Sequence, residues 1–119
     1  MATLTRVAPE LPVKNLHQAL SHYERQLGFE VVMTMPAGDY AIVERDRVAV
    51  HLFESASTDA PGSIHIFAQG LDDLHAELLA RGAQLTQSIV RKPWGTRDFR
   101  VVDSSGNVIK FTEPLAEDD

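Results

Sequence analysis

The sequence predicts an α+β fold in which two βαβββ units form a curled mixed sheet around a cleft. The first observation is that the same order of apolar and turn segments occurs twice along the chain. The second is that a glycine closes the helical pattern of each half, at Gly28 and at Gly82. The third is that Tyr40 and Trp94, each beside a Pro- or Gly-containing turn, are separated by the same interval as the two glycines. Each unit exposes one sheet face, which must be buried against another unit.

The first unit begins with an expected strand at residues 4–13. Pro9 and Pro12 each remove a ladder donor, so this strand should lie at a sheet edge or pair irregularly. Asn15 is the expected N-cap of a helix that runs to about Leu27, with apolar residues at helical spacing. The other expected strands of this unit are residues 29–35, 40–44 and 47–54.

The second unit follows a small, polar linker at residues 55–62. Asp72 is the expected cap of its helix, whose apolar positions are leucines. The turn of the last hairpin is expected at residues 103–107, where Gly106 or Asn107 should take a positive φ. The expected strands of this unit are residues 63–69, 83–90 and the two arms of a hairpin within residues 92–113.

The composition is that of an ordinary soluble protein, with 44% hydrophobic and 24% charged residues. We expect one domain over residues 1–119, with units at about 4–54 and 63–114. The chain has no apolar run that could span a membrane and no signal peptide, so we expect a cytoplasmic protein without a membrane partner. The absence of cysteine excludes disulfides, thiolate nucleophiles and Cys-ligated metals. A net charge of −6 argues against a nucleic-acid partner.

Two signatures of catalysis are missing from the chain. There is no Gly-x-Ser-x-Gly turn for a nucleophile and no Gly-rich loop for a phosphate. Without thiols, the remaining acid–base candidates are scattered histidines and carboxylates. The residues therefore favour binding over catalysis.

Several segments are similar to one known superfamily, and together they cover nearly the whole chain. These segments are residues 8–16, 22–29, 70–74, 93–95 and 103–107. The chain resembles the glyoxalase/bleomycin resistance/dioxygenase (vicinal oxygen chelate) superfamily, and within it the bleomycin resistance proteins. The resemblance implies a homodimer with two clefts at the subunit interface and an exchanged N-terminal strand. It also implies that a bleomycin-like drug is sequestered without any bond being made or broken.

Metal-using members of this superfamily place His or Glu at four positions on the inner strands. The resemblance assigns these positions to Ala8, His51, Ile66 and Lys110. Only His51 can ligate, whereas a divalent metal of this kind needs three or more converging ligands. A one-residue slip in the strand of Ile66 would add His65 as a second ligand. Glu10 shares a strand face with Ala8, whereas Glu113 points to the face opposite Lys110. We expect no metal and no cofactor, and a residual site among His51, His65, Glu10 or Glu113 stays open.

A planar cationic ligand is best bound by aromatic faces with carboxylates nearby. The resemblance implies that an aromatic residue at Tyr40 and the indole of Trp94 sandwich the bithiazole of the drug. Asp39 precedes Tyr40 and is an expected contact for a cationic tail. The full set of expected ligand-binding residues is Tyr40, Trp94, Asp39, His51, Phe53, Arg100 and Lys110.

Other interpretations of the same residues stay open. Phe53, Phe67 and Phe99 are expected in the core rather than in the cleft, and Trp94 fits a dimer interface equally well. Basic residues near the cleft would suit an anionic ligand; they are Arg97, Arg100 and Lys110. The alternative function is a divalent-metal-dependent lyase, dioxygenase or thiol transferase of the same superfamily. A third possibility is a fold relative that binds another small molecule.

Overall fold

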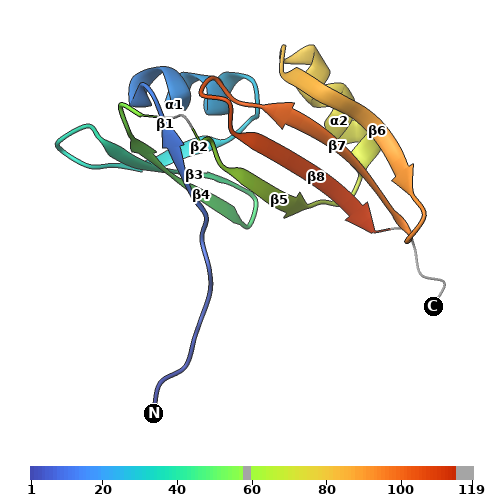
Figure 1. Cartoon of the computed structure of the whole chain (residues 1–119), viewed down its shortest axis with the longest axis horizontal. Helices are drawn as coiled ribbons and strands as arrows, with labels where there is room; N and C mark the ends of the chain where they lie inside the picture. Colours follow the sequence, from blue (N-terminus) through green and yellow to red (C-terminus); the bar gives the residue numbers. More distant parts are fainter. Residues whose placement is uncertain (58–59, 115–119) are drawn as a thin grey trace.

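The computed structural model describes residues 1–57 and 60–114 and contains the two predicted βαβββ units (Figure 1). The first unit consists of β1 (Glu10–Val13), α1 (Leu16–Arg25), β2 (Glu30–Thr34), β3 (Tyr40–Arg45) and β4 (Val48–Glu54). The second consists of β5 (Ser63–Phe67), α2 (Leu71–Ala80), β6 (Gln84–Lys92), β7 (Thr96–Val102) and β8 (Val108–Pro114). Residues 58–59 of the expected linker and residues 115–119 lie outside the described residues.

Each unit forms its own four-stranded mixed sheet. The strand order is β1-β4-β3-β2 in the first sheet and β5-β8-β7-β6 in the second. In both sheets the first strand of the unit pairs parallel with the last, and the remaining pairs are antiparallel. The two halves therefore share one topology, which confirms the repeat predicted from the sequence.

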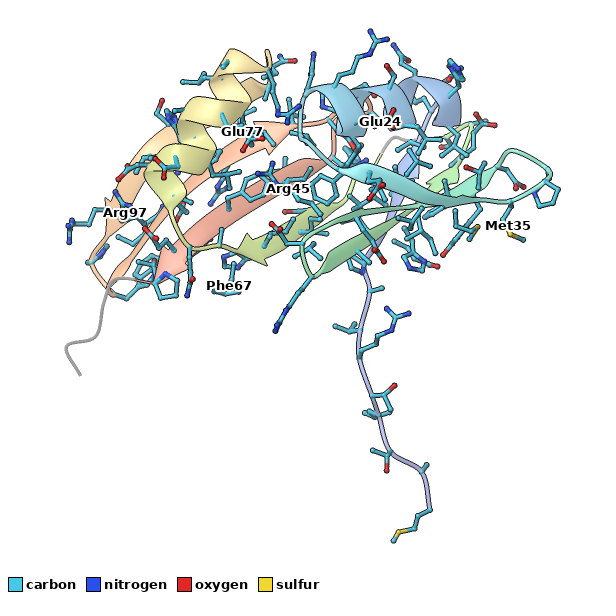
Figure 2. The ribbon with its side chains drawn as sticks, turned by 180° about the vertical axis from the view of Figure 1, so that it is seen from behind. Glu24, Met35, Arg45, Phe67, Glu77 and Arg97 are labelled. Carbon is cyan, nitrogen blue, oxygen red and sulfur yellow. The ribbon has the colours of Figure 1, made fainter. Side chains whose placement is uncertain are left out.

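One face of each sheet packs against the helix of its own unit. On β4, Val50 and Leu52 are fully buried, while His51 and Phe53 point to the opposite face and are half-buried. The corresponding buried residues of β7 and β8 are Phe99, Val101, Ile109 and Phe111. Both helices lie on the same side of the strands, as the view from behind shows (Figure 2). The core is thus two helix–sheet layers.

The opposite side of each sheet carries no helix and is called its open face. The open face of the first sheet is defined by Glu10, Tyr40, Ile42, His51 and Phe53. The open face of the second sheet is defined by His65, Phe67, Asp98, Arg100, Lys110 and Thr112. These two faces carry most of the residues that the sequence singled out for binding.

The first strand is shorter than predicted, because pairing starts at Glu10 rather than at residue 4. Residues 1–9 instead extend away from the body as an arm (Figure 1). The apolar side chains of Leu4 and Val7 in this arm are 99% and 91% exposed. As predicted for a strand that contains proline, β1 lies at a sheet edge, where it pairs only with β4.

The two helices begin in different ways. Asn15 caps α1 as predicted, since its side-chain oxygen accepts a hydrogen bond from the Gln18 N–H at 2.8 Å. The prediction for α2 is wrong: the helix begins at Leu71, and Asp72 does not cap it. Gly70, in the left-handed region with φ of 71°, is the N-cap residue, and its N–H donates to the Glu113 carboxylate at 2.8 Å. The acceptor comes from β8, far away in sequence, so no local pattern indicates it.

Glu113 gives the fold a defined response to acid. Its carboxylate lies 2.7 Å from the Arg97 guanidinium, and this hydrogen bond, with those from the Gly70 and Leu71 N–H groups, lowers the pKa of Glu113 below its ordinary 4.5. The stability that this carboxylate contributes is therefore fully present above about pH 4.5 and is lost as the pH falls through the lowered pKa. We expect Glu113→Gln to remove this part of the pH dependence of the urea midpoint, with a loss under about 1 kcal/mol at neutral pH. An unchanged acid slope in Glu113→Gln would contradict this assignment.

The turn between β7 and β8 is organised around the buried carboxylate of Asp103. One oxygen accepts the N–H groups of Ser105 and Asn107 at 2.8 and 2.9 Å. The other accepts the Tyr23 hydroxyl at 2.8 Å and the Asn107 side-chain amide at 2.9 Å. Burial, followed by the charge of Asp103, raises the pKa of Tyr23 well above its ordinary 10.0, so Tyr23 stays a donor. Gly106 takes the positive φ of this turn, at 89°.

This turn also connects the second unit to the first. The Asn107 side chain donates to the Pro12 carbonyl at 2.8 Å and accepts the Gly62 N–H at 2.6 Å. The Lys14 N–H donates to the Ser105 hydroxyl at 2.9 Å. The group around Asp103 therefore ties β1 and α1 to the β7–β8 turn.

A second link between the units lies on the helix side. The Arg45 guanidinium at the end of β3 donates to both oxygens of Glu77 on α2, at 2.7 and 3.1 Å (Figure 2). Arg45 also donates to the Leu27 carbonyl at 3.0 Å. Such two-point pairing fixes orientation as well as distance.

Neither helix in the described part of the chain is long and apolar enough to cross a membrane.

Candidate functional site

Three polar side chains meet on the open face of the first sheet. The parallel pairing of β1 with β4 sets Glu10 directly beside His51. Tyr40 reaches across from β3, and its hydroxyl lies 2.7 Å from the Glu10 carboxylate and 2.6 Å from Nδ1 of His51. The Tyr40 and His51 rings meet edge to face at 5.7 Å. The hydrogen bond to Glu10 raises the pKa of Tyr40, so the phenol remains protonated.

A shallow pocket of about 480 Å³ lies next to this cluster. It is lined by Met33, Met35, Asp39, Tyr40, Phe53 and Glu54. The structure therefore brings together four of the predicted residues, namely Asp39, Tyr40, His51 and Phe53. The pocket offers the rings of Tyr40 and Phe53 and two thioethers for an apolar ring system, with the Asp39 carboxylate beside them. The Glu54 carboxylate instead accepts the Leu16 N–H at the start of α1, at 3.0 Å.

Met33 and Met35 were not predicted as site residues, and β2 contains an irregularity that explains the position of Met33. Val31 pairs with Val43, but Met33 pairs with Ile42, so a β-bulge between them inserts one extra residue. This shift turns Met33 from the helix side to the open face that Ile42 shares. Met35, at the β2–β3 turn, is 46% exposed (Figure 2). Strict alternation along β2 would not have shown this.

The residues do not fit a divalent-metal centre of the superfamily type. Two of the four superfamily metal positions are not on the open faces: Ala8 precedes β1, and Ile66 packs against the core. The nearby side chains that do lie on the open faces are Glu10 and His65. Glu113 lies on the helix side, where it pairs with Arg97, as predicted for the face opposite Lys110. No group of three or more possible ligands occurs among the described residues. The Tyr40 hydroxyl occupies the point on which Glu10 and His51 converge.

A row of polar residues crosses the open face of the second sheet. His65 pairs with Lys110, Lys110 with Arg100, and Arg100 with Gln87 on neighbouring strands; the row is His65, Lys110, Arg100 and Gln87. Burial, followed by the charge of Lys110, lowers the pKa of His65. His65 is also within hydrogen-bonding distance of the Thr112 hydroxyl, at 2.5 Å.

A buried carboxylate lies beside this row. Asp98, only 1% exposed, shares the open face with Arg100 two residues away. Gln87 donates to it at 2.7 Å, and the Lys92 ammonium lies 3.9 Å from its other oxygen. Asp98 was not predicted as a site residue, because an acidic residue in a strand gives no local signal of burial.

The remaining aromatic and basic predictions have mixed outcomes. Phe99 is buried in the core as predicted, whereas Phe53 is half-buried on the open face. The core prediction for Phe67 is wrong, since its ring is 62% exposed on the edge strand β5 (Figure 2). Arg97 is also misplaced by the prediction, because it pairs with Asp72 and Glu113 on the helix side.

Tyr40 and Trp94 do not meet within one chain. Tyr40 opens β3 in the first sheet, whereas Trp94 lies in the turn between β6 and β7, at the far end of the second sheet (Figure 1). The Trp94 side chain is 71% exposed. The predicted binding residues therefore form two groups, one on the first sheet and one on the second.

Comparisons with known proteins agree with this architecture. The family model "Glyoxalase/Bleomycin resistance protein/Dioxygenase superfamily" matches residues 3–111. A bleomycin resistance protein of Geobacillus stearothermophilus is 27% identical over 127 aligned positions, covering 90% of this chain and 95% of that protein. The bleomycin resistance determinant encoded on transposon Tn5 is similar in structure, with a TM-score of 0.84 at 19% identity over 95% of this chain and 100% of that one.

A structure with a bound drug is also similar. The bleomycin-binding protein of Streptomyces verticillus, complexed with copper(II)-bleomycin, has a TM-score of 0.79 at 24% identity, covering 98% of this chain and 100% of that one. The family match over almost the whole length, together with the duplicated βαβββ topology, leads to one conclusion. The chain belongs to the glyoxalase/bleomycin resistance protein/dioxygenase superfamily.

Proposed function

We propose that this protein binds and sequesters bleomycin-like glycopeptide antibiotics without modifying them chemically. The observation that carries the proposal is a pair of accessible aromatic platforms. The Tyr40 ring is held by Glu10 and His51 beside the shallow pocket that Met33 and Phe53 line. The Trp94 side chain is 71% exposed. The names of the Geobacillus relative and of the Streptomyces structure give independent support for this class of ligand.

The chemistry of such a site is non-covalent. A planar heteroaromatic ring gains roughly 1–3 kcal/mol from stacking on one aromatic side chain. The two hydrogen bonds to the Tyr40 hydroxyl fix the ring before the ligand arrives, so less rotamer freedom is lost on binding. The exposed carboxylate of Asp39, which lines the pocket, suits a cationic tail. We infer no bond-making step from these residues.

The proposal includes a homodimer, because one chain cannot place Tyr40 and Trp94 on the same ligand. A second copy would set the open face of its second sheet against the open face of the first sheet. The arm of residues 1–9 supports this arrangement, since Leu4 and Val7 expose apolar surface that a partner would cover. Exchange of the arm and β1 between subunits would bury both side chains.

Truncation tests the role of the arm. We expect deletion of residues 1–8 to shift the protein from dimer to monomer in sedimentation velocity, because it removes the exposed apolar contacts. Replacing Thr3 and Thr5 with serine is a matched control that leaves the dimer intact. A truncated protein that remains fully dimeric would remove the arm from the interface.

A fluorescence titration tests the function itself. Trp94 is the only tryptophan of the chain, so any change in emission on adding bleomycin reports on the β6–β7 turn. We expect saturable quenching at submicromolar drug, on protein whose metal content has been measured. A flat titration on folded dimer would contradict the proposal, and a flat titration with about one metal per chain would favour the metal-dependent enzyme.

A further inference from the structure

The second sheet carries two half-buried cations that have no carboxylate partner. Five lysine and arginine side chains are half-buried in the described residues, and they are Arg45, Lys92, Arg97, Arg100 and Lys110. The first three each lie within 4.0 Å of an Asp or Glu oxygen. Among residues 1–57 and 60–114, Arg100 and Lys110 have no Asp or Glu oxygen within 4.0 Å. The Arg100 Nε atom is buried without a hydrogen-bond partner.

The register places these two cations side by side. Arg100 and Lys110 are directly opposite each other in the antiparallel β7–β8 pair, on the same open face. Like charges at this position repel each other and destabilise a sheet. Lys110 is also directly beside His65 on β5, and its charge helps to lower the pKa of that ring. The row is therefore a region of positive potential in a chain whose net charge is −6.

The neighbouring carboxylate does not neutralise this pair. Asp98 lies two positions along the ladder, opposite Thr112 rather than Lys110. Its side chain accepts from Gln87 at 2.7 Å, and Lys92 is its nearest cation, at 3.9 Å. Apart from the buried Nε of Arg100, the donors of Arg100 and Lys110 thus remain available to a group that approaches the open face.

We propose that Arg100 and Lys110 form a binding site for an oxyanion, a carboxylate or phosphate group of a small-molecule ligand. A guanidinium beside an ammonium matches the two-oxygen edge of either group. The exposed Phe67 ring stacks on His65 at 4.5 Å next to the row, and it offers an apolar surface for the body of such a ligand. The site is the half of the candidate site that lies on the second sheet, and binding of an oxyanion there does not depend on bleomycin, so the inference goes beyond the proposed function.

The test uses inorganic phosphate and benzoate as probes on the full-length protein. Backbone and Arg side-chain NMR shifts are followed in wild type, Arg100→Gln, Lys110→Gln and Arg91→Gln. Arg91 is a matched control, since it is an exposed arginine on β6 and its loss changes the net charge equally. We expect saturable shifts at His65, Arg100 and Lys110, and binding at least about tenfold weaker in the two row variants but not in the control.

The two probes separate the sources of the oxyanion. Stronger phosphate binding would indicate a phosphorylated ligand, and stronger benzoate binding would indicate an aromatic or apolar carboxylate that uses Phe67. Equal affinities in Arg100→Gln, Arg91→Gln and wild type, or the absence of shifts at the row with millimolar probe, would overturn the proposal.

A stability measurement gives a second, independent readout. Because the like charges repel, we expect Arg100→Gln to unfold at the same or higher urea concentration than wild type. The better-binding probe should raise the urea midpoint of wild type and of Arg91→Gln but not of Arg100→Gln. The same rise in all three proteins would exclude specific binding at the row. A bleomycin titration of the wild-type protein keeps the two proposals separate. If the wild type did not bind bleomycin, the proposed function would fail, but the phosphate and benzoate measurements would still test the oxyanion site.

Discussion

Replacing Asp103 with alanine is expected to lower the free energy of unfolding by about 3–5 kcal/mol. The carboxylate accepts four hydrogen bonds and is only 4% exposed. Its loss would leave the buried Tyr23 hydroxyl and the backbone N–H groups of Ser105 and Asn107 without this acceptor, and each unpaired group costs about 1–3 kcal/mol. Since a domain of this size is stable by only about 5–15 kcal/mol, a large share of the fold depends on one side chain.

Urea unfolding followed by circular dichroism measures this effect, and two further variants make it specific. Ser104→Ala, in the same turn but exposed, should leave the midpoint almost unchanged. Tyr23→Phe removes one donor and should cost less than Asp103→Ala, about 1–2 kcal/mol. Asp103→Asn keeps the size but introduces an amide donor where only donors approach, so it should also destabilise. A midpoint in Asp103→Ala equal to that of Ser104→Ala would show that the turn does not hold the units together.

The repeated architecture was predictable because its signals are local. Gly28 and Gly82 mark the helix ends, and both take a positive φ, at 74° and 88°. The turn at residues 103–107 is likewise encoded by residues that lie next to one another, with Gly106 in the left-handed region. Such short-range requirements can be read from one chain, and they fixed the order of all ten elements.

The details that failed depend on partners far away in the sequence. The N-cap residue of α2 is Gly70 rather than Asp72, and its N–H donates to Glu113, which only the folded β8 brings there. Phe67 resembles a core residue in its strand, but β5 is an edge strand and its alternate positions face outward. The bulge that turns Met33 to the open face follows from pairing with β3, which no single strand specifies.

The candidate site was predictable only as two halves. Asp39, Tyr40, His51 and Phe53 share the first sheet because strands β3 and β4 pair in register. Arg100 and Lys110 share the second sheet for the same reason. The relation between Tyr40 and Trp94 lies beyond one chain, since the fold itself separates them (Figure 1). The central element of the proposed function therefore has to be tested between chains.

Replacing Trp94 with alanine is expected to weaken bleomycin binding by about 1–3 kcal/mol, which corresponds to roughly five- to 150-fold in Kd. The indole is largely exposed, so its loss should not change the stability of the free protein. Isothermal titration calorimetry measures the affinity without relying on tryptophan emission. Leu79→Ala is a control, because it also removes an exposed apolar side chain but on α2, on the helix side. Trp94→Phe should recover part of the affinity, since it retains an aromatic face.

Mixed dimers decide whether Tyr40 and Trp94 of different chains share one cleft. A dimer of one Tyr40→Ala chain with one Trp94→Ala chain would then hold one intact cleft and one cleft that lacks both rings. We expect such a dimer to bind half of the wild-type amount of drug with unchanged affinity. If both rings of a cleft came from the same chain, every cleft would lack one ring, and the titration would show full stoichiometry at reduced affinity. Because stacking on each ring contributes separately, the two outcomes differ in both stoichiometry and Kd, and the second would overturn the shared cleft.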